Sequence, residues 1–312
     1  WIGHGLGSFE AHYMDYQANF FKQCGQSRFS MLADNVKQPF NEYLGLLLNF
    51  GIIGLLVLLL LMVIIIYCYR KNPSVEKQIA FYSLSSIGIF SFFSYPFAYP
   101  FVWVVTFLSI FIITSEYIKP LFSNILIKKI ACMFILTYSL FGSSKLFERI
   151  QAELDWGKAS TLALCKSYNE TLPTYERLEK MFVSNPYFLY NYAAVLQEMK
   201  QYTESLEVAL KCRQYWADYD LELIIGENYQ QLNKPELAEK YYNSASMMCP
   251  SRFLPLYKLF HLYKTNGEKE RSLAMAEAVI SKPMKIKTTT IRMMKREMER
   301  EIQKMNMSIK LE

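Results

Sequence analysis

Hydrophobic positions are distributed unevenly along the 312-residue chain. Long apolar runs fall before Phe147, whereas from Gln151 onward apolar residues recur at helical spacing among charged ones. A run of about 20 apolar residues is long enough to cross the ~30 Å hydrocarbon core of a bilayer. The pattern therefore predicts a membrane-spanning half followed by a charged, helical half.

Four apolar runs in the first half are interpreted as transmembrane helices. They cover residues 44–69, 79–95, 101–117 and 130–147. The first run holds only Asn49 as a strongly polar residue. The uncharged turn 96–100 joins the second and third runs, so these two are expected to form a membrane hairpin. The fourth is near the lower length limit for a span, and a buried or interfacial helix is the alternative.

Basic residues cluster in two of the short connections between these runs. One connection carries Arg70, Lys71 and Lys77, and another carries Lys119, Lys128 and Lys129. Because Lys and Arg accumulate on the cytoplasmic side of membrane proteins, both connections are predicted to be cytoplasmic. Residues 1–43 and everything after Phe147 then lie on the opposite side, which is the periplasm if the protein resides in a bacterial inner membrane.

Small residues recur in the second half with a period of about 34 residues. They are Ala193, Ser205 and Cys212 in a unit counted from Pro186, Gly226, Ala238 and Ala245 in a unit from Tyr219, and Ala278 in a unit from Arg252. Pro250 and Pro283 end the second and third units. This pattern resembles the tetratricopeptide repeat, a helical hairpin whose two helices meet at small residues.

Two further segments flank the three units. Residues 155–186 are predicted to form a degenerate hairpin upstream, and residues 288–312 to form a capping helix downstream. The face that would cover the last repeat consists of Ile291, Met294, Met298, Ile302 and Met305. A helix on a membrane surface or on a partner is the alternative for this tail.

The predicted fold class is all-α, with polytopic transmembrane helices followed by an α-solenoid of tetratricopeptide-type hairpins. The expected domains are a periplasmic loop over 1–43, about four transmembrane helices over 44–147, repeats over 148–287 and a capping helix over 288–312. Because the sequence starts at Trp1 without a Met or a signal peptide, it is expected to be truncated at its N-terminus.

Solenoid repeats present a concave surface whose side chains select the ligand. Five tyrosines are candidates to line this surface or, alternatively, to pack between helices: Tyr187, Tyr190, Tyr219, Tyr229 and Tyr257. Protein partners are therefore expected. The net charge of +6 is modest and the charges are interleaved, which gives no indication of nucleic-acid binding. The six cysteines contain no CxxC pair, so neither a metal site nor a cofactor is predicted.

The segment before the first span combines glycines with polar groups near the bilayer surface. The opening Gly3, Gly5 and Gly7 is a weak match to a phosphate-binding loop, and a tight turn is the favoured interpretation. Arg28 and Lys37 could bind a phosphate or diphosphate, while Asn41 and Glu42 fall near the start of the first membrane helix. Alternatively, the two cations are solvated and Asn41 only caps the helix.

The stretches GHGLGSFEAHYMDYQANFF and ADNVKQPFNEYLGLLLNFGIIGLL resemble the periplasmic loop and following helix of the O-antigen ligase and O-antigen polymerase superfamily. The resemblance covers roughly residues 1–115. It implies transfer of a glycan from a polyprenyl diphosphate carrier to a lipid A core, glycan or protein acceptor, without metal or cofactor. It also implies that further membrane spans precede Trp1, that the intact protein is the active form and that this part alone is inactive.

By this resemblance the candidate site residues are Arg28, Lys37, Asn41 and Glu42, with Arg28 or Lys37 steadying the leaving diphosphate. The sequence departs from the ligase pattern at Phe40, where ligases carry a histidine, so a general base is not assigned. His4 and His12 lie in the same loop. The alternative function is a non-catalytic, membrane-anchored scaffold for protein partners of cell-envelope assembly, and transport of a lipid-linked glycan is a weaker third hypothesis.

Overall fold

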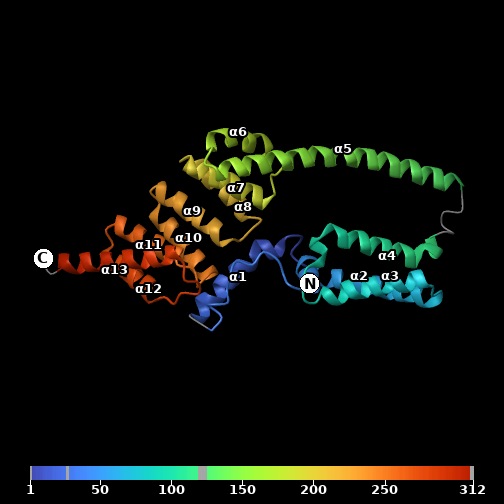
Figure 1. The fold of residues 1–312 in the computed structure, drawn as a ribbon, viewed down its shortest axis with the longest axis horizontal. Helices are drawn as coiled ribbons and strands as arrows, with labels where there is room; N and C mark the ends of the chain where they lie inside the picture. The colour runs from blue at the N-terminus through green and yellow to red at the C-terminus, as the bar shows by residue number, and fades with distance from the viewer. Residues whose placement is uncertain (1, 26–27, 119–124, 310–312) are drawn as a thin grey trace. The chain divides into compact units, whose positions relative to one another are not determined.

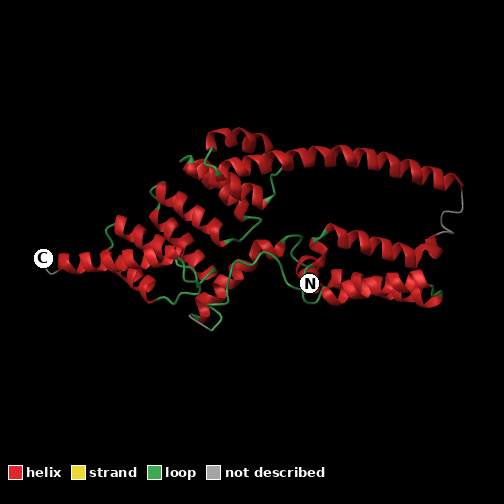
Figure 2. Ribbon diagram, viewed as in Figure 1, coloured by secondary structure: helices red, strands yellow, loops and turns green. Residues whose placement is uncertain are grey.

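The computed structural model describes residues 2–25, 28–118 and 125–309. These residues form thirteen α-helices, a short 3-10 helix and connecting turns, with no strand (Figures 1 and 2). The all-α prediction is confirmed. The chain divides into two compact units, Trp1–Phe9 with Lys37–Gln151 and Glu10–Val36 with Ala152–Glu312. The segment expected as one loop, 1–43, is thus shared between the units.

The first unit contains the apolar helices. They are α2 (Glu42–Lys71), α3 (Val75–Phe90), η1 (Pro96–Ala98), α4 (Pro100–Ile118) and the first part of α5 (Ile125–Leu164). Among the described residues, α2, α4 and α5 are long and apolar enough to cross a membrane. The second predicted run lies mostly in α3, which ends at Phe90 and has only 16 residues. Lys119, one of the orienting cations, lies outside the described residues.

A kink in α2 explains the glycine-rich opening. Gly51 adopts φ 65° and ψ −159°, which interrupts the helix and exposes backbone carbonyls one turn earlier. The N–H groups of His4 and Gly5 donate to the carbonyls of Leu48 and Asn49, at 2.9 and 3.0 Å. A Cβ at Gly3 would lie 2.5 Å from the Asn49 carbonyl oxygen, so this close approach requires glycine. The predicted tight turn is therefore present, and it closes the kink.

The second unit contains the helical hairpins. The helices are α6 (Tyr168–Leu178), α7 (Pro186–Glu198), α8 (Tyr202–Arg213), α9 (Tyr219–Gln231), α10 (Pro235–Met248), α11 (Leu254–Thr265), α12 (Lys269–Ser281) and α13 (Thr289–Ile309). Helices α7 and α8, α9 and α10, and α11 and α12 pack as successive antiparallel pairs (Figure 1). In the first two pairs every predicted small residue is buried, which confirms their register.

The third hairpin begins one residue later than predicted. Ala278 is half-buried, whereas Ser272 and Val279 are fully buried. These two residues follow Ala238 and Ala245 by one period of 34 residues, so the unit starts at Phe253 and not at Arg252. The place of the first small residue is taken by Phe260, which is 0% exposed. Because this position holds a large residue, the sequence pattern did not show where the third unit begins.

Helix α13 covers the end of the array. Met298 is fully buried against Phe253, Phe260 and α12, and the other four apolar residues of the predicted face join the same cluster. The Tyr257 hydroxyl donates to Glu297 at 2.9 Å, and the Lys295 ammonium donates to the Ile280 carbonyl at 2.6 Å. The packing agrees with a capping role for this helix.

The second unit also includes α1 (Ser8–Cys24) and the loop after it. Met14 of α1 is 1% exposed and packs with Tyr219 and Leu223 of α9. The Gln17 amide donates to the Met248 carbonyl at 2.6 Å, across 231 positions of sequence. Residues 10–36 are therefore an element of the repeat unit, although they precede the apolar helices in the chain.

Candidate functional site

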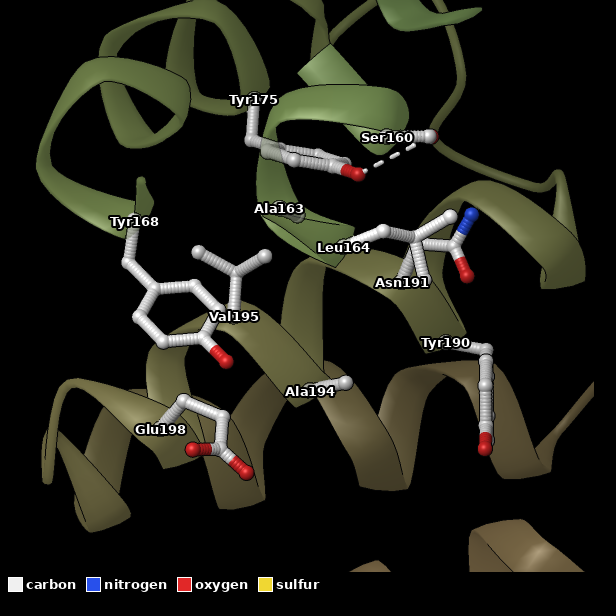
Figure 3. A pocket seen from close by; sticks show the side chains of 10 residues that line it. All are labelled: Ser160, Ala163, Leu164, Tyr168, Tyr175, Tyr190, Asn191, Ala194, Val195 and Glu198. Carbon is white, nitrogen blue, oxygen red and sulfur yellow. Dashed lines mark hydrogen bonds between the residues drawn. The ribbon is translucent and has the colours of Figure 1, made fainter. Parts of the chain in front are cut away.

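A hollow in the repeat unit, here called the tyrosine hollow, is built by α5, α6 and α7 (Figure 3). Its lining residues are Ser160, Ala163, Leu164, Tyr168, Tyr175, Tyr190, Asn191, Ala194, Val195 and Glu198. The contribution of α7 follows from helical periodicity, because residues spaced three and four apart share one face. Asn185 caps α7, its side chain accepting from the Phe188 N–H at 3.1 Å, and Pro186 occupies the first turn.

One wall of the tyrosine hollow is held by core packing. Tyr175 is 1% exposed, its ring stacks on Tyr192 with 5.6 Å between centroids, and its hydroxyl lies 3.2 Å from the Ser160 hydroxyl (Figure 3). Burial raises the pKa of Tyr175 above its usual value. This tyrosine therefore remains a neutral, fixed wall at physiological pH.

The opposite side of the hollow carries its charge. Glu198 is the charged residue among the ten that line it, and it lies beside Tyr168 (Figure 3). Desolvation raises the pKa of the Tyr168 hydroxyl, and the charge of Glu198 and a side-chain hydrogen bond with it raise it further. The volume of about 340 Å³ is sufficient for one or two amino-acid side chains. The site therefore combines apolar and aromatic walls, the Asn191 amide and one carboxylate.

An aromatic contact path leads from the tyrosine hollow to α1. Tyr190 lies edge-on to Trp216 with centroids 5.7 Å apart, and Trp216 contacts the ring of Tyr187 at 5.2 Å. The Tyr187 hydroxyl donates to the Glu10 carboxylate at 3.4 Å. Side chains that line the hollow and side chains that seat α1 are thus connected by direct contacts.

Of the five tyrosines proposed for the concave surface, Tyr190 lines the tyrosine hollow. The others make packing contacts: Tyr187 with Trp216, Tyr219 in the core at 6% exposure, Tyr229 with Tyr241, and Tyr257 with His261. The alternative interpretation, packing between helices, therefore holds for most of them.

Two of the four sequence-predicted site residues, Asn41 and Glu42, are brought together at the start of α2. The Asn41 side chain accepts from the Leu44 N–H at 2.9 Å and donates to the Phe92 carbonyl at 3.0 Å. The Glu42 carboxylate accepts from the Phe97 N–H at 3.0 Å. Asn41 therefore caps α2, and both residues hold the segment between α3 and α4.

The other two predicted site residues are cations in loops. Arg28 belongs to the repeat unit, is exposed, and places its guanidinium 4.8 Å from the centroid of the Phe29 ring. Lys37 belongs to the first unit and is exposed in the loop before α2. Phe40, at the place of the ligase histidine, is exposed and contacts the ring of Tyr95 at 5.5 Å. A catalytic role for these residues stays a prediction.

Sequence reasoning missed a charged cluster between α1 and the repeats. Arg213, at the end of α8, forms ion pairs with Asp15 of α1 and with Glu222 of α9. Glu222 is 2% exposed, so its carboxylate depends on the guanidinium for compensation. The available signal was an acidic residue inside the apolar stretch of α9.

No family model matches the sequence, and no curated protein matches it. Several solved structures are similar to part of the chain. YrrB, described as a TPR protein with an unusual peptide-binding site, shares 18% identity over 41% of this chain and 66% of its own, with a TM-score of 0.37. MamA shares 13% identity over 49% and 89% of the two chains, with a TM-score of 0.40. A MamA segment from Desulfovibrio magneticus RS-1 shares 18% over 47% and 76%, with a TM-score of 0.38.

The assignment of the second half rests on its own geometry, in which successive hairpins bury small residues one period apart. It is a tetratricopeptide-like helical repeat domain. Such domains act by presenting a surface to a ligand, and the tyrosine hollow is one concave feature of the repeat unit.

Proposed function

We propose that the protein is a membrane-anchored scaffold whose tetratricopeptide-like repeats bind a protein partner, of the kind that acts in cell-envelope assembly. The observation that carries this proposal is the tyrosine hollow, which is open, has fixed aromatic walls and joins three helices of the array. Three apolar helices long enough to span a bilayer supply the anchor.

The lining of the hollow suits an extended peptide with a basic side chain. The Asn191 amide has both a donor and an acceptor for a peptide group. The Glu198 carboxylate attracts a Lys or Arg side chain, and tyrosine rings contact the aliphatic stem and the cation of such a residue. The partner is therefore expected to present a basic segment.

Photocrosslinking in cells tests this function. A photoreactive residue replaces Leu164, which is 86% exposed at the rim of the hollow. A crosslinked partner is expected, and Glu198→Lys should remove it by charge repulsion. The matched control is Glu207→Lys, which changes an exposed carboxylate of α8 outside the hollow and should leave the crosslink intact. A crosslink that survives Glu198→Lys would contradict the proposal.

The packing of α1 against the repeats supports a membrane topology for the scaffold. Residues 10–36 and 152–312 form one compact unit, so both segments must occupy the same side of the membrane. The chain between them must therefore cross an even number of times. In the proposed topology the three long apolar helices make three crossings, and α3, which has 16 residues, makes the fourth. With the cationic connections inside, we propose that α1 and the repeats lie in the periplasm of a bacterial inner-membrane protein.

Two native cysteines allow a direct test of this topology. Cys24 is the last residue of α1 and is exposed, and Cys165 is exposed directly after α5. In variants that retain only one of them, a membrane-impermeant maleimide should label both positions in intact, outer-membrane-permeabilised cells. Labelling of one position only after lysis of the inner membrane would refute the shared compartment.

A second candidate function is the glycan transferase implied by the resemblance. The observation that favours it is that the glycine-rich opening and the first apolar helix, which carry the resemblance, contact one another through His4, Gly5, Leu48 and Asn49. In the full-length protein, Arg28→Ala and Lys37→Ala should then shorten or detach surface glycans. Unchanged glycan length and attachment in both variants would exclude this function for the loop.

A further inference from the structure

The face of residues 10–36 that points away from the repeats is aromatic. Tyr16 and Phe20 lie one turn apart on α1 and are 67% and 42% exposed. Phe29 and Leu32 follow in the next turn and are 44% and 73% exposed, and the Phe20 and Phe29 rings are 6.5 Å apart. These four residues, here called the aromatic face, form an apolar patch that the described residues do not cover.

The charges of the same segment are sorted between its two sides. The acidic residues turn toward the repeats, where Asp15 pairs with Arg213 and Asp34 pairs with Arg252 at 2.8 Å. Lys22 is exposed, and it forms no ion pair within the part of the chain that the structure describes. Helical geometry places Lys22 on a flank of α1, about 120° around the axis from Tyr16, whereas the Arg28 guanidinium lies against the Phe29 ring of the aromatic face. The outward side is therefore aromatic and cationic.

The position of the aromatic face is fixed by the opposite side of the segment. Met14 and Phe21 are 1% and 5% exposed, and the Asn35 amide donates to Asp218 at 2.7 Å. The aromatic residues stay exposed because rotation of α1 would break the ion pair of its acidic side with the repeats and would expose Met14 and Phe21. In the chain, Leu32 precedes the start of α2 at Glu42 by ten positions, which span at most about 35 Å.

We propose that the aromatic face binds the surface of the bilayer, with Tyr16, Phe20, Phe29 and Leu32 at the level of the headgroups and Lys22 and Arg28 against lipid phosphates. Aromatic and leucine side chains combined with Lys and Arg are the composition that partitions into the membrane interface. Each cation near an anionic leaflet adds to the attraction. The repeats, seated on the other side of residues 10–36, are held beside the membrane by this contact.

Depth-dependent fluorescence quenching in nanodiscs tests the proposal on the full chain. Bimane is attached at Tyr16→Cys or Leu32→Cys in a variant that lacks the six native cysteines, and the nanodiscs contain headgroup-proximal doxyl lipids. Quenching should exceed that at Glu236→Cys, on α10, by at least about twofold, as expected of an interfacial segment. Equal quenching at these positions would overturn the proposal.

Lipid composition and charge provide the second arm. Nanodiscs of phosphatidylglycerol and phosphatidylethanolamine should give stronger quenching than nanodiscs of phosphatidylcholine, and Lys22→Gln with Arg28→Gln should remove this difference. If the aromatic face instead crosslinks to a protein or to a second copy of the chain while quenching is absent, the lipid assignment is wrong. Neither outcome depends on the partner of the tyrosine hollow.

Discussion

Replacing Arg213 by alanine should destabilise the repeat unit strongly, because it leaves the carboxylate of Glu222 buried and uncompensated. Glu222 is 2% exposed, and Arg213 also pairs with Asp15. Removing one partner of a buried ion pair costs about 3–5 kcal/mol, and the side chain of Arg213 is 21% exposed, so the lower end of that range applies. At roughly 2–4 °C per kcal/mol for a domain of this size, Tm should fall by roughly 6–12 °C.

Thermal unfolding of the full chain in detergent, followed by tryptophan fluorescence, measures this shift, because Trp156 and Trp216 report on the repeat unit. The double variant Arg213→Ala with Glu222→Gln should recover about half of the loss, since the stranded charge is then absent. The control is Arg177→Ala, which breaks an exposed pair with Asp155 and should cost less than about 1 kcal/mol. A shift for Arg213→Ala no larger than that of the control would refute the argument.

Four other substitutions test the packing and the electrostatics of the same unit. Gly226→Ala should lose about 1–3 kcal/mol, because its Cβ would lie 2.6 Å from the Tyr242 ring, whereas Gly157→Ala, with open space, should be neutral or stabilising in the same melting assay. Met14→Ala should cost about 2–5 kcal/mol and increase hydrogen exchange in α9, which an autonomous repeat array would not show. Burial lowers the pKa of Lys282 to about 8. The unfolded chain therefore binds more protons above that pH, and urea titrations should show stability rising by about 1–3 kcal/mol between about pH 8 and 10, a rise that Lys282→Met should abolish.

The hairpins could be predicted from the sequence because their determinants are local. Gly226, Ala238 and Ala245 mark one hairpin through spacing alone, and all three are buried. The third hairpin was misregistered by one position because Phe260 replaces the first small residue, and a large residue carries no such signal. The shortness of α3 was also missed, since an apolar run does not show where its helix ends.

The candidate site was less accessible to sequence reasoning. Tyr190 was recognised as a possible surface residue, but Glu198 at the end of α7 is indistinguishable in sequence from an ordinary solvated charge. The ion pair of Asp15 with Arg213 joins positions 198 residues apart, and such a pairing has no local pattern. Asn41 was correctly considered as a helix cap, because a cap depends only on the residues that follow it.

The packing of α1 against the repeats joins segments that are synthesised far apart in time. Gln17 and Asn35 leave the ribosome before the apolar helices, yet their hydrogen-bond partners follow 231 and 183 positions later. If the apolar helices span a membrane as proposed, the repeat unit cannot finish folding until the last of them is inserted. In that topology, a chain that lacks one crossing would have α1 and the repeats on opposite sides of the membrane. Met14 and Glu222 would then lose the contacts that cover them. In the proposed topology, completion of this unit therefore requires correct insertion, and a misinserted chain keeps part of its core exposed.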